Sequence, residues 1–263
     1  MKRIGLIGFG YIGAGIYDRI VTQPALGLEV AFVHNRTATK LTHVPTDLIL
    51  PDLADFARYK ADLIVEVAHP DITRQYGAAF LRQADYFILS ATALADATLQ
   101  AHLLETCKQH HTQLIIPHGA LIGVDNLVES RSRWQSVTIT FRKHPRNIDF
   151  SLTTIAPTQI TQPTIIYDGP VRGIAPLFPR NVNTMMTCAL ATVGLDVCRA
   201  VLIADPSLNV AIAEVEAIGH DGAHMMTRKS VPVMGVSGNE MLDSTFYSLL
   251  RAAQVRSAGI GFV

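Results

Sequence analysis

Short apolar runs alternate with stretches of helical spacing through the first half of the chain. Residues 3–7 form a β-rich apolar run, and Ile12, Ile16 and Ile20 then recur at the spacing of one helix face. Further apolar runs occupy residues 28–33, 63–67, 86–89 and 113–116, and each intervening stretch can be helical. Strands that alternate with helices are typical of a parallel sheet with right-handed crossovers. The first half is therefore predicted to be an α/β, doubly wound parallel sheet.

The hydrophobic pattern changes after about residue 125. Runs at 137–142, 149–155 and 164–167 show β-branched alternation without helices of comparable length between them. This pattern is typical of an antiparallel or mixed sheet. The sequence also predicts a helix or two within 174–193 and further strands at 200–204, 210–217 and 225–228. We expect a second, α+β domain over residues 126–239.

The segment at 240–254 has helical composition. Leu242, Phe246, Leu249 and Leu250 lie on one stripe of such a helix. We expect this terminal helix, at about 240–263, to pack back on the first domain, which otherwise spans residues 1–125.

Composition narrows the possible partners. The 22 basic and 22 acidic side chains cancel, and the charged fraction is 17%, below the roughly 25% of a typical soluble domain. We expect neither nucleic acid nor a membrane as partner, and the low charge favours a homo-oligomer that covers apolar surface. Cys107, Cys188 and Cys198 lack CxxC spacing, which fits reduced thiols. With no secretory signal pattern at the N-terminus, we expect a soluble, cytoplasmic protein.

A glycine pattern follows the first apolar run. Gly8, Gly10 and Gly13 form GxGxxG around Tyr11 and Ile12, between the first predicted strand and the first predicted helix. In this context the first glycine permits a tight turn, the second lets backbone approach a pyrophosphate, and the third allows close helix packing. The helix N-terminus adds N–H donors and partial positive charge. The alternative is a glycine turn that binds nothing, but the pattern favours a dinucleotide-binding Rossmann domain.

The end of the second predicted strand bears on the choice of nucleotide. Asn35, Arg36 and Thr37 stand where an acidic residue would accept from the ribose 2′-hydroxyl of NAD. Asn35 carries no charge to repel a 2′-phosphate, and Arg36 can pair with one. NADP is therefore the expected cofactor, with NAD left possible, and the alternative is that Arg36 is a solvated loop residue.

Several longer segments occur in an order typical of one family. They are HNR (34–36), LIVEVAHPD (63–71), ILSATALAD (88–96), IIPHGALIGVD (115–125), YDGPVRGIAPLFPRNVNTMMTCALATVGLD (167–196) and VLIADPSLN (201–209). With the glycine turn, these segments resemble the L-aspartate dehydrogenase family. The matched segments are spread over most of the chain from residue 4 to about 216.

The resemblance implies a Rossmann domain paired with a second α/β domain, which would carry the substrate and dimerisation surfaces, in a homodimer. It also implies oxidation of L-aspartate to iminoaspartate, or the reverse amination of oxaloacetate, with a nicotinamide cofactor. The expected partner is thus a small amino or keto acid. Such an enzyme holds an anionic amino acid and manages one proton on the amine or on water.

The resemblance also assigns residues to the nicotinamide half of the cofactor. Ala120 and Asn183 lie there by position, with Asn181 as a neighbour that could exchange roles with Asn183. The two asparagines could instead cap a helix beginning near Thr184. Further expected cofactor contacts follow the third and fourth apolar runs, namely Ala68, His69 and Ala91. For His69 the alternative is that it only shapes the loop before Pro70.

Three positions depart from the family pattern. The acid/base histidine of the family falls on Ala211, and alanine transfers no proton. A family segment NPKTS, expected before the last helix, is replaced by the different residues at 236–241. The third departure is His118, which replaces the serine that the family commonly has before Gly119 and Ala120.

His118 is the candidate catalytic residue. It follows a predicted parallel strand, on the side where doubly wound sheets bind ligands, and an imidazole titrates near neutral pH. It could line the substrate pocket and partly replace the missing histidine. The alternative is a turn histidine hydrogen-bonded to backbone.

No metal site is expected. His220 and His224 stand four residues apart, but Gly219 and Gly222 indicate a turn rather than a helix there. Charges that could serve the substrate come from Glu66, Arg142, Lys143, Arg172, Arg180, Arg228 and Lys229. Of these, Arg172 or Arg228 could pair with a substrate carboxylate in two hydrogen bonds, and no spacing chooses between them.

The sequence thus predicts an NAD(P)-dependent oxidoreductase that acts on the CH–NH2 group of L-aspartate or a related amino acid. The second interpretation is a nucleotide-binding sensor or structural protein that has the same fold and little catalysis. Ala211 is the feature that favours it.

Overall fold

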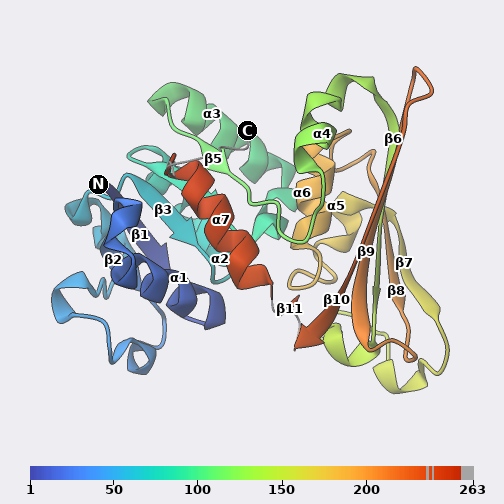
Figure 1. Cartoon of the computed structure of the whole chain (residues 1–263), viewed down its shortest axis with the longest axis horizontal. Coiled ribbons are helices and arrows are strands. Elements are labelled where there is room, and N and C mark those ends of the chain that lie inside the picture. Colours follow the sequence, from blue (N-terminus) through green and yellow to red (C-terminus); the bar gives the residue numbers. More distant parts are fainter. Residues whose placement is uncertain (235–236, 239, 256–263) are drawn as a thin grey trace. The chain divides into compact units, whose positions relative to one another are not determined.

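The computed structural model describes residues 1–234, 237–238 and 240–255, and the chain divides into two compact units (Figure 1). The first unit comprises residues 1–93, 97–117 and the described residues from 242 onward. The second comprises residues 94–96 and the described residues of 118–241. The end of the expected terminal helix, at 256–263, and parts of segment 236–241 lie outside the described residues.

Among the described residues, the first unit contains one five-stranded sheet with the strand order β2-β1-β3-β4-β5, and all the pairings are parallel. Its strands are β1 (Lys2–Ile7), β2 (Leu28–His34), β3 (Leu63–Glu66), β4 (Asp85–Ile88) and β5 (Leu114–Ile115). Its helices are α1 (Tyr11–Thr22), α2 (Pro70–Leu81), α3 (Ala97–His110) and α7 (Met241–Ala252). The predicted doubly wound parallel sheet is confirmed.

Helices cover both faces of this sheet, which explains why its strands read as continuous apolar runs. On one face, Ile16 of α1 and Phe246 and Leu249 of α7 join a core with Ile4 and Leu6 of β1. On the other face, Phe80 of α2 packs against Tyr86 of β4, and Leu103 of α3 is fully buried. The strand order reverses between β1 and β3, and ligands of such sheets bind where the order reverses, at the carboxyl ends of the strands.

The second unit has a six-stranded mixed sheet within the part of the chain that the structure describes, in the order β11-β10-β9-β6-β8-β7. Its strands are β6 (Trp134–Lys143), β7 (Thr164–Pro170), β8 (Arg199–Ala204), β9 (Val210–Gly219), β10 (His224–Met234) and β11 (Ser237–Gly238). Its helices are α4 (Val124–Glu129), α5 (Val171–Ile174) and α6 (Asn183–Ala191). The β6–β8 pair is parallel and the other pairs are antiparallel, so the sheet is mixed.

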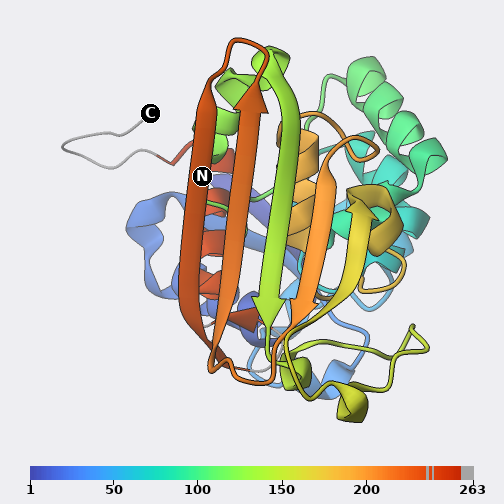
Figure 2. The same cartoon turned by 90° about the vertical axis from the view of Figure 1, so that its right-hand side faces the viewer.

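The face of this sheet that α6 covers is apolar. Val137, Ile139 and Phe141 of β6 are buried, and they alternate with the less buried Thr138 and Thr140. Figure 2 shows the sheet from its other side, with α6 behind the strands.

The strand predicted at 149–155 is wrong, because this segment forms turns. The Asp149 carboxylate accepts a hydrogen bond from the backbone N–H of Ser151 at 3.1 Å. The backbone N–H of Asp149 donates to Oδ1 of Asn181 at 2.9 Å. Backbone groups that a strand would use for its ladder are thus held by polar side chains.

The glycine turn fixes how closely α1 approaches β1. A Cβ at Gly13 would lie 2.0 Å from the carbonyl oxygen of Gly8, whereas a Cβ at Gly10 would meet no atom within 4 Å. Gly8 has φ +100°, which favours glycine, and a Cβ there would lie 2.8 Å from the carbonyl oxygen of Val67. Only glycine fits at positions 8 and 13.

We expect Gly13→Ala to lower the free energy of unfolding by about 2–3 kcal/mol, because the added methyl group overlaps backbone that cannot move aside. Gly10→Ala is the matched control, since φ there is −83° and the space is open; its stability should change by less than about 0.5 kcal/mol. Urea denaturation of both variants measures the difference. Equal stabilities would show that α1 does not depend on this contact.

Candidate active site

The turn between β1 and α1 presents backbone donors to open space. Gly10 precedes the first residue of α1, Tyr11, which is 67% exposed. Because no described atom lies within 4 Å of where a Cβ at Gly10 would be, a ligand can approach this backbone closely. The free N–H groups and dipole of a helix N-terminus favour an anion there. Tyr11 and Ile12 form the first turn of this helix, and the geometry fits a pyrophosphate.

Asn35 ties the loop after β2 to the glycine turn. Its Oδ1 accepts from the backbone N–H of Phe9 at 3.0 Å, and its Nδ2 donates to the carbonyl of Thr37 at 2.9 Å. Its amide therefore shapes the turn, a role that the charge argument from sequence missed. Arg36 stands between Asn35 and Thr37 in the sequence and is exposed. Within the described residues its guanidinium has no hydrogen-bond or ion-pair partner.

Glu66 ends β3 and holds the loops that follow β3 and β4. Its Oε1 accepts from the backbone N–H of Ala68 at 2.6 Å and from the hydroxyl of Ser90 at 2.9 Å. Its Oε2 accepts from the backbone N–H of Ser90 at 3.1 Å. Ala68 and Ala91, two of the expected cofactor contacts, are therefore positioned through one carboxylate. Sequence reasoning noted Glu66 only as a charge, since the bonds depend on the neighbouring strand.

Burial raises the pKa of Glu66 from its ordinary 4.5 to about 7. The side chain is fully buried, and desolvation of the carboxylate outweighs the N–H and hydroxyl donors, which act in the opposite direction. The two loops are therefore held by a carboxyl group that changes its protonation state near neutral pH.

His69 caps α2. Its Nδ1 accepts from the backbone N–H of Asp71 at 3.3 Å, and the ring is exposed beside the Asp71 carboxylate. This is the loop-shaping alternative considered for His69 above. Its contact with the cofactor stays a prediction.

In the second unit, the segment from His118 to Leu121 forms a turn that packs on the start of α6. The backbone N–H of Leu121 donates to the carbonyl of His118 at 2.9 Å. Gly119 has φ +60°, and a Cβ there would lie 2.7 Å from the hydroxyl of Thr184. That hydroxyl also accepts from the backbone N–H of Ala120 at 3.2 Å. The fold thus brings Ala120 close to Thr184, the neighbour of Asn183.

Neither asparagine precedes α6 as its cap residue. The helix begins at Asn183, and the residue before it is Val182. Asn181 is buried, and its amide binds the loop at 147–149 through Nδ2 to the carbonyl of Asn147 at 2.9 Å, in addition to its bond with Asp149. The capping role considered for Asn181 is wrong because both its polar atoms serve this loop.

Ala211 lies in β9, opposite Val231 of β10. It is half-buried and offers no titratable group. Directly after β8, the strand that precedes β9 in the sequence, the Asp205 carboxylate accepts from the backbone N–H of Ser207 at 2.9 Å and from its hydroxyl at 2.6 Å. Asp205 therefore shapes the turn into β9.

Most of the cations considered for the substrate already bind acids of the chain. Arg172 forms two bonds with Asp196, at 2.6 and 2.7 Å. The other pairs are Arg142 and Arg228 with Glu214, Arg180 with Asp149, and Lys229 with Glu240. Arg172 and Arg228, the two carboxylate partners suggested by the sequence, are thus both engaged within the protein.

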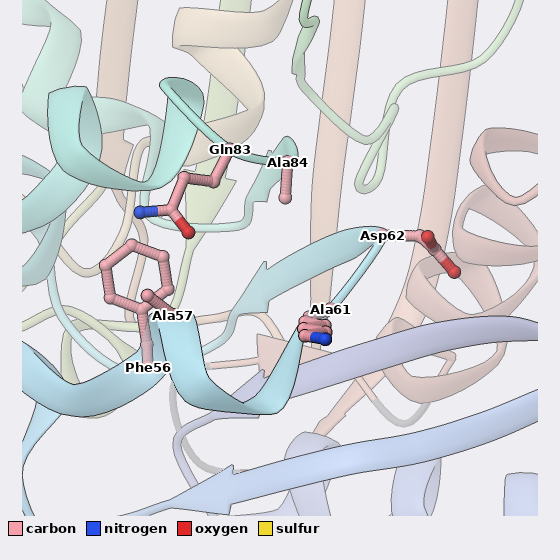
Figure 3. Close-up of a pocket in the computed structure, with 7 residues that line it drawn as sticks. Phe56, Ala57, Ala61, Asp62, Gln83 and Ala84 are labelled. Atoms are coloured by element: carbon pink, nitrogen blue, oxygen red, sulfur yellow. The ribbon is translucent and has the colours of Figure 1, made fainter.

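A pocket of about 250 Å3 lies elsewhere in the first unit (Figure 3). It is lined by Phe56, Ala57, Lys60, Ala61, Asp62, Gln83 and Ala84. Asp62 and Ala84 immediately precede β3 and β4, so the pocket lies at the amino ends of these strands. The glycine turn and Glu66 lie at the carboxyl ends, and the pocket is separate from the candidate site.

Within residues 1–234, 237–238 and 240–255, no three His, Cys, Asp or Glu side chains cluster as metal ligands would. His220 and His224 lie at the turn between β9 and β10, and His224 pairs with Glu216 at 3.1 Å. No helix in the described part of the chain is long and apolar enough to span a membrane.

Comparison with protein families gives two matches. Residues 125–249 match the model described as "Aspartate dehydrogenase, C-terminal", and residues 8–117 match "Homoserine dehydrogenase, NAD binding domain". The second match contains the glycine turn and Glu66, and the first contains most of the second unit.

Similar proteins agree with these matches. The chain is 42% identical over 214 residues to an aspartate dehydrogenase domain-containing protein of Xenopus tropicalis, covering 78% of this chain and 75% of the relative. The Danio rerio protein of the same description is 34% identical over 94% of each chain. An L-aspartate dehydrogenase of Nitrosopumilus maritimus is 28% identical, covering 88% of this chain and 89% of the relative. The crystal structure of aspartate dehydrogenase from Thermotoga maritima has the same fold, with a TM-score of 0.74, 23% identity and full coverage of both chains.

The raised pKa of Glu66 leads to a stability prediction. Its folded-state pKa of about 7 lies above 4.5, so the folded state keeps the proton longer and wild-type stability falls as the pH rises between these values. Glu66→Gln has no such titration. As the pH rises across that range, we expect the unfolding free energy of Glu66→Gln to increase relative to that of wild type by up to about 3 kcal/mol.

Denaturant unfolding from pH 4.5 to 8 measures this change. Glu105→Gln, at an exposed position on α3, is the control and should differ from wild type by a constant amount. A constant difference for Glu66→Gln as well would mean that the buried carboxyl keeps its ordinary pKa.

Proposed function

Since this chain belongs to the aspartate dehydrogenase family, we propose that it oxidises the CH–NH2 group of L-aspartate or a closely related amino acid, or catalyses the reverse reductive amination. The family and the dehydrogenase fold identify an NAD(P)-dependent oxidoreductase. The observation that carries the proposal is the glycine turn, where Gly10 leaves the N-terminus of α1 accessible beside the loops held by Glu66.

The nicotinamide cofactor would be bound mainly by backbone. Gly8, Gly10 and Gly13 allow the diphosphate to approach α1, and the loops that contain Ala68 and Ala91 are fixed through Glu66. When bound, the cofactor accepts or gives the hydride. The protein positions the amino acid and moves its proton.

His118 is proposed as the group that moves this proton. It lies in the turn fastened to α6 through Ala120 and Thr184, and the histidine position of the family is Ala211. An imidazole exchanges protons near neutral pH.

The reaction itself is the first test. Purified protein supplied with oxaloacetate, ammonia and NADPH or NADH should oxidise the reduced cofactor, followed at 340 nm. His118→Ser should lower the substrate-dependent rate by about 10²-fold or more, as loss of a general acid/base does, with cofactor affinity nearly unchanged. Tight cofactor binding without turnover of any keto or amino acid would favour a nucleotide sensor instead.

Arg36 tests the preference for NADP. The side chain is exposed, follows β2 and has no acidic partner among the described residues. We expect Arg36→Ala to weaken NADPH binding by about 1.5–3 kcal/mol, the range for a hydrogen bond between charged groups, and to leave NADH binding unchanged. Fluorescence titration measures both affinities.

The matched control is Arg58→Ala. Arg58 is another exposed arginine of the first unit, and it is paired with Asp55. It should change neither affinity. Equal losses for NADPH and NADH in Arg36→Ala would contradict a contact with the 2′-phosphate.

A further inference from the structure

Lys143 differs from the other cations considered for the substrate. Each of those cations has a carboxylate of the chain within 4 Å. Among the described residues, the Lys143 ammonium has no carboxylate within this distance and no hydrogen-bond acceptor. The sequence alone does not distinguish Lys143 from its neighbour Arg142, since only the fold shows which of the two is paired.

The position of Lys143 accounts for its burial. It is the last residue of β6, on the same face as Val137, Ile139 and Phe141, and it is 8% exposed. Its Nζ lies 5.2 Å from the centroid of the Phe141 ring. A cation over an aromatic face is stabilised to some extent. This stabilisation is smaller than the desolvation penalty of a buried charge.

The ammonium nitrogen is nevertheless not completely enclosed. Every fully enclosed side-chain nitrogen or oxygen among the described residues has a hydrogen-bond partner. The Nζ of Lys143 has none, so it retains accessible surface. Lys143 is therefore a buried cation without a counter-charge among the described residues, and its nitrogen keeps a small accessible surface.

The strand register puts Lys143 and Ala211 on one face of the sheet. Arg142 pairs with Ile212 at the end of the antiparallel β6–β9 ladder, and Lys143 and Ala211 are the residues directly beyond this last pair. Residues directly opposite in such a ladder share a face of the sheet. Ala213 pairs with Phe141, so Ala211 and Lys143, each two residues further along its strand, lie on that same face of the sheet.

We propose that Lys143 binds a carboxylate of the substrate. The assignment rests on the proposed function for the identity of the substrate as an amino or keto acid, but the site is defined by the chain itself. A carboxylate supplies the counter-charge and the acceptors for three N–H donors. Burial lowers the pKa of Lys143 to about 8, so the side chain still carries its charge at neutral pH.

The test compares wild type with Lys143→Met, which keeps the length of the side chain and removes the charge. Succinate is the probe, because it has two carboxylates and no group to oxidise or aminate. Calorimetry on the full-length protein with NADPH present should show succinate affinity reduced at least 30-fold in Lys143→Met. The affinity for NADPH should change less than twofold.

Stability without any ligand separates binding from a structural role. A buried charge without a counter-ion destabilises the fold, so Lys143→Met should melt at a higher temperature than wild type when no anion is present. Succinate should raise the melting temperature of wild type and leave that of Lys143→Met unchanged. A lower melting temperature for Lys143→Met alone would assign the lysine to the fold and overturn the proposal.

Lys229→Met is the matched control, since that lysine belongs to the same unit and is already paired with Glu240. It should bind succinate like wild type. In turnover, Lys143→Met should raise KM for oxaloacetate at least 30-fold. A fall in kcat with unchanged KM and loss of one limb of the pH profile would instead make Lys143 a proton-transfer group, and the proposal would be wrong.

Failure of the proposed function gives a different pattern. If wild type binds succinate through Lys143 but turns over no amino or keto acid, the carboxylate site stands and the dehydrogenase activity does not. If wild type turns over oxaloacetate and Lys143→Met does so with the same KM, the activity stands and the assignment of Lys143 fails.

Discussion

The contact between the Gly8 carbonyl and Gly13 sets the distance between β1 and α1, and much of the first unit depends on it. Because α1 lies this close to the sheet, the side chain of Leu242 can pack against Gly15. A Cβ at Gly15 would lie only 2.5 Å from that side chain. Arg19 on the same helix pairs with Asp243. The apolar stripe of α7 thereby packs against the core to which β1 contributes. One backbone approach thus arranges two helices and leaves the N-terminus of the first of them accessible.

Each of the two units has a buried ionisable side chain that forms no ion pair with any described residue. The Glu66 carboxylate accepts from N–H and hydroxyl donors of two loops, while the Lys143 ammonium lies 5.2 Å from the centroid of the Phe141 ring. A fold optimised for stability alone would replace such groups by apolar ones. We attribute their burial to the roles proposed for them: Glu66 orders backbone at the proposed nucleotide site, and Lys143 offers charge to the proposed carboxylate.

What the sequence predicts well is local. The glycine turn, the alternation of the parallel strands and the stripe of Leu242, Phe246 and Leu249 all depend on residues close together in the chain, so the fold class was predictable. The strand expected at 149–155 failed because Asn181, some thirty residues away, holds its backbone. The importance of Glu66 and Lys143 was equally hidden, since burial and pairing follow from the register of neighbouring strands. The family resemblance placed Ala120 near Asn183, which spacing alone could not do.

The position of α7 has a consequence for the order of folding. The last described strand of the first unit's sheet ends at Ile115. The core of this unit nevertheless includes Phe246 and Leu249, which follow the second unit in the sequence. During synthesis, which proceeds from the N-terminus, the face of the sheet awaiting α7 stays exposed until more than a hundred further residues have been made. The nucleotide-binding unit, although first in sequence, is therefore the last to be finished, and its nascent form is the species most in need of protection from aggregation.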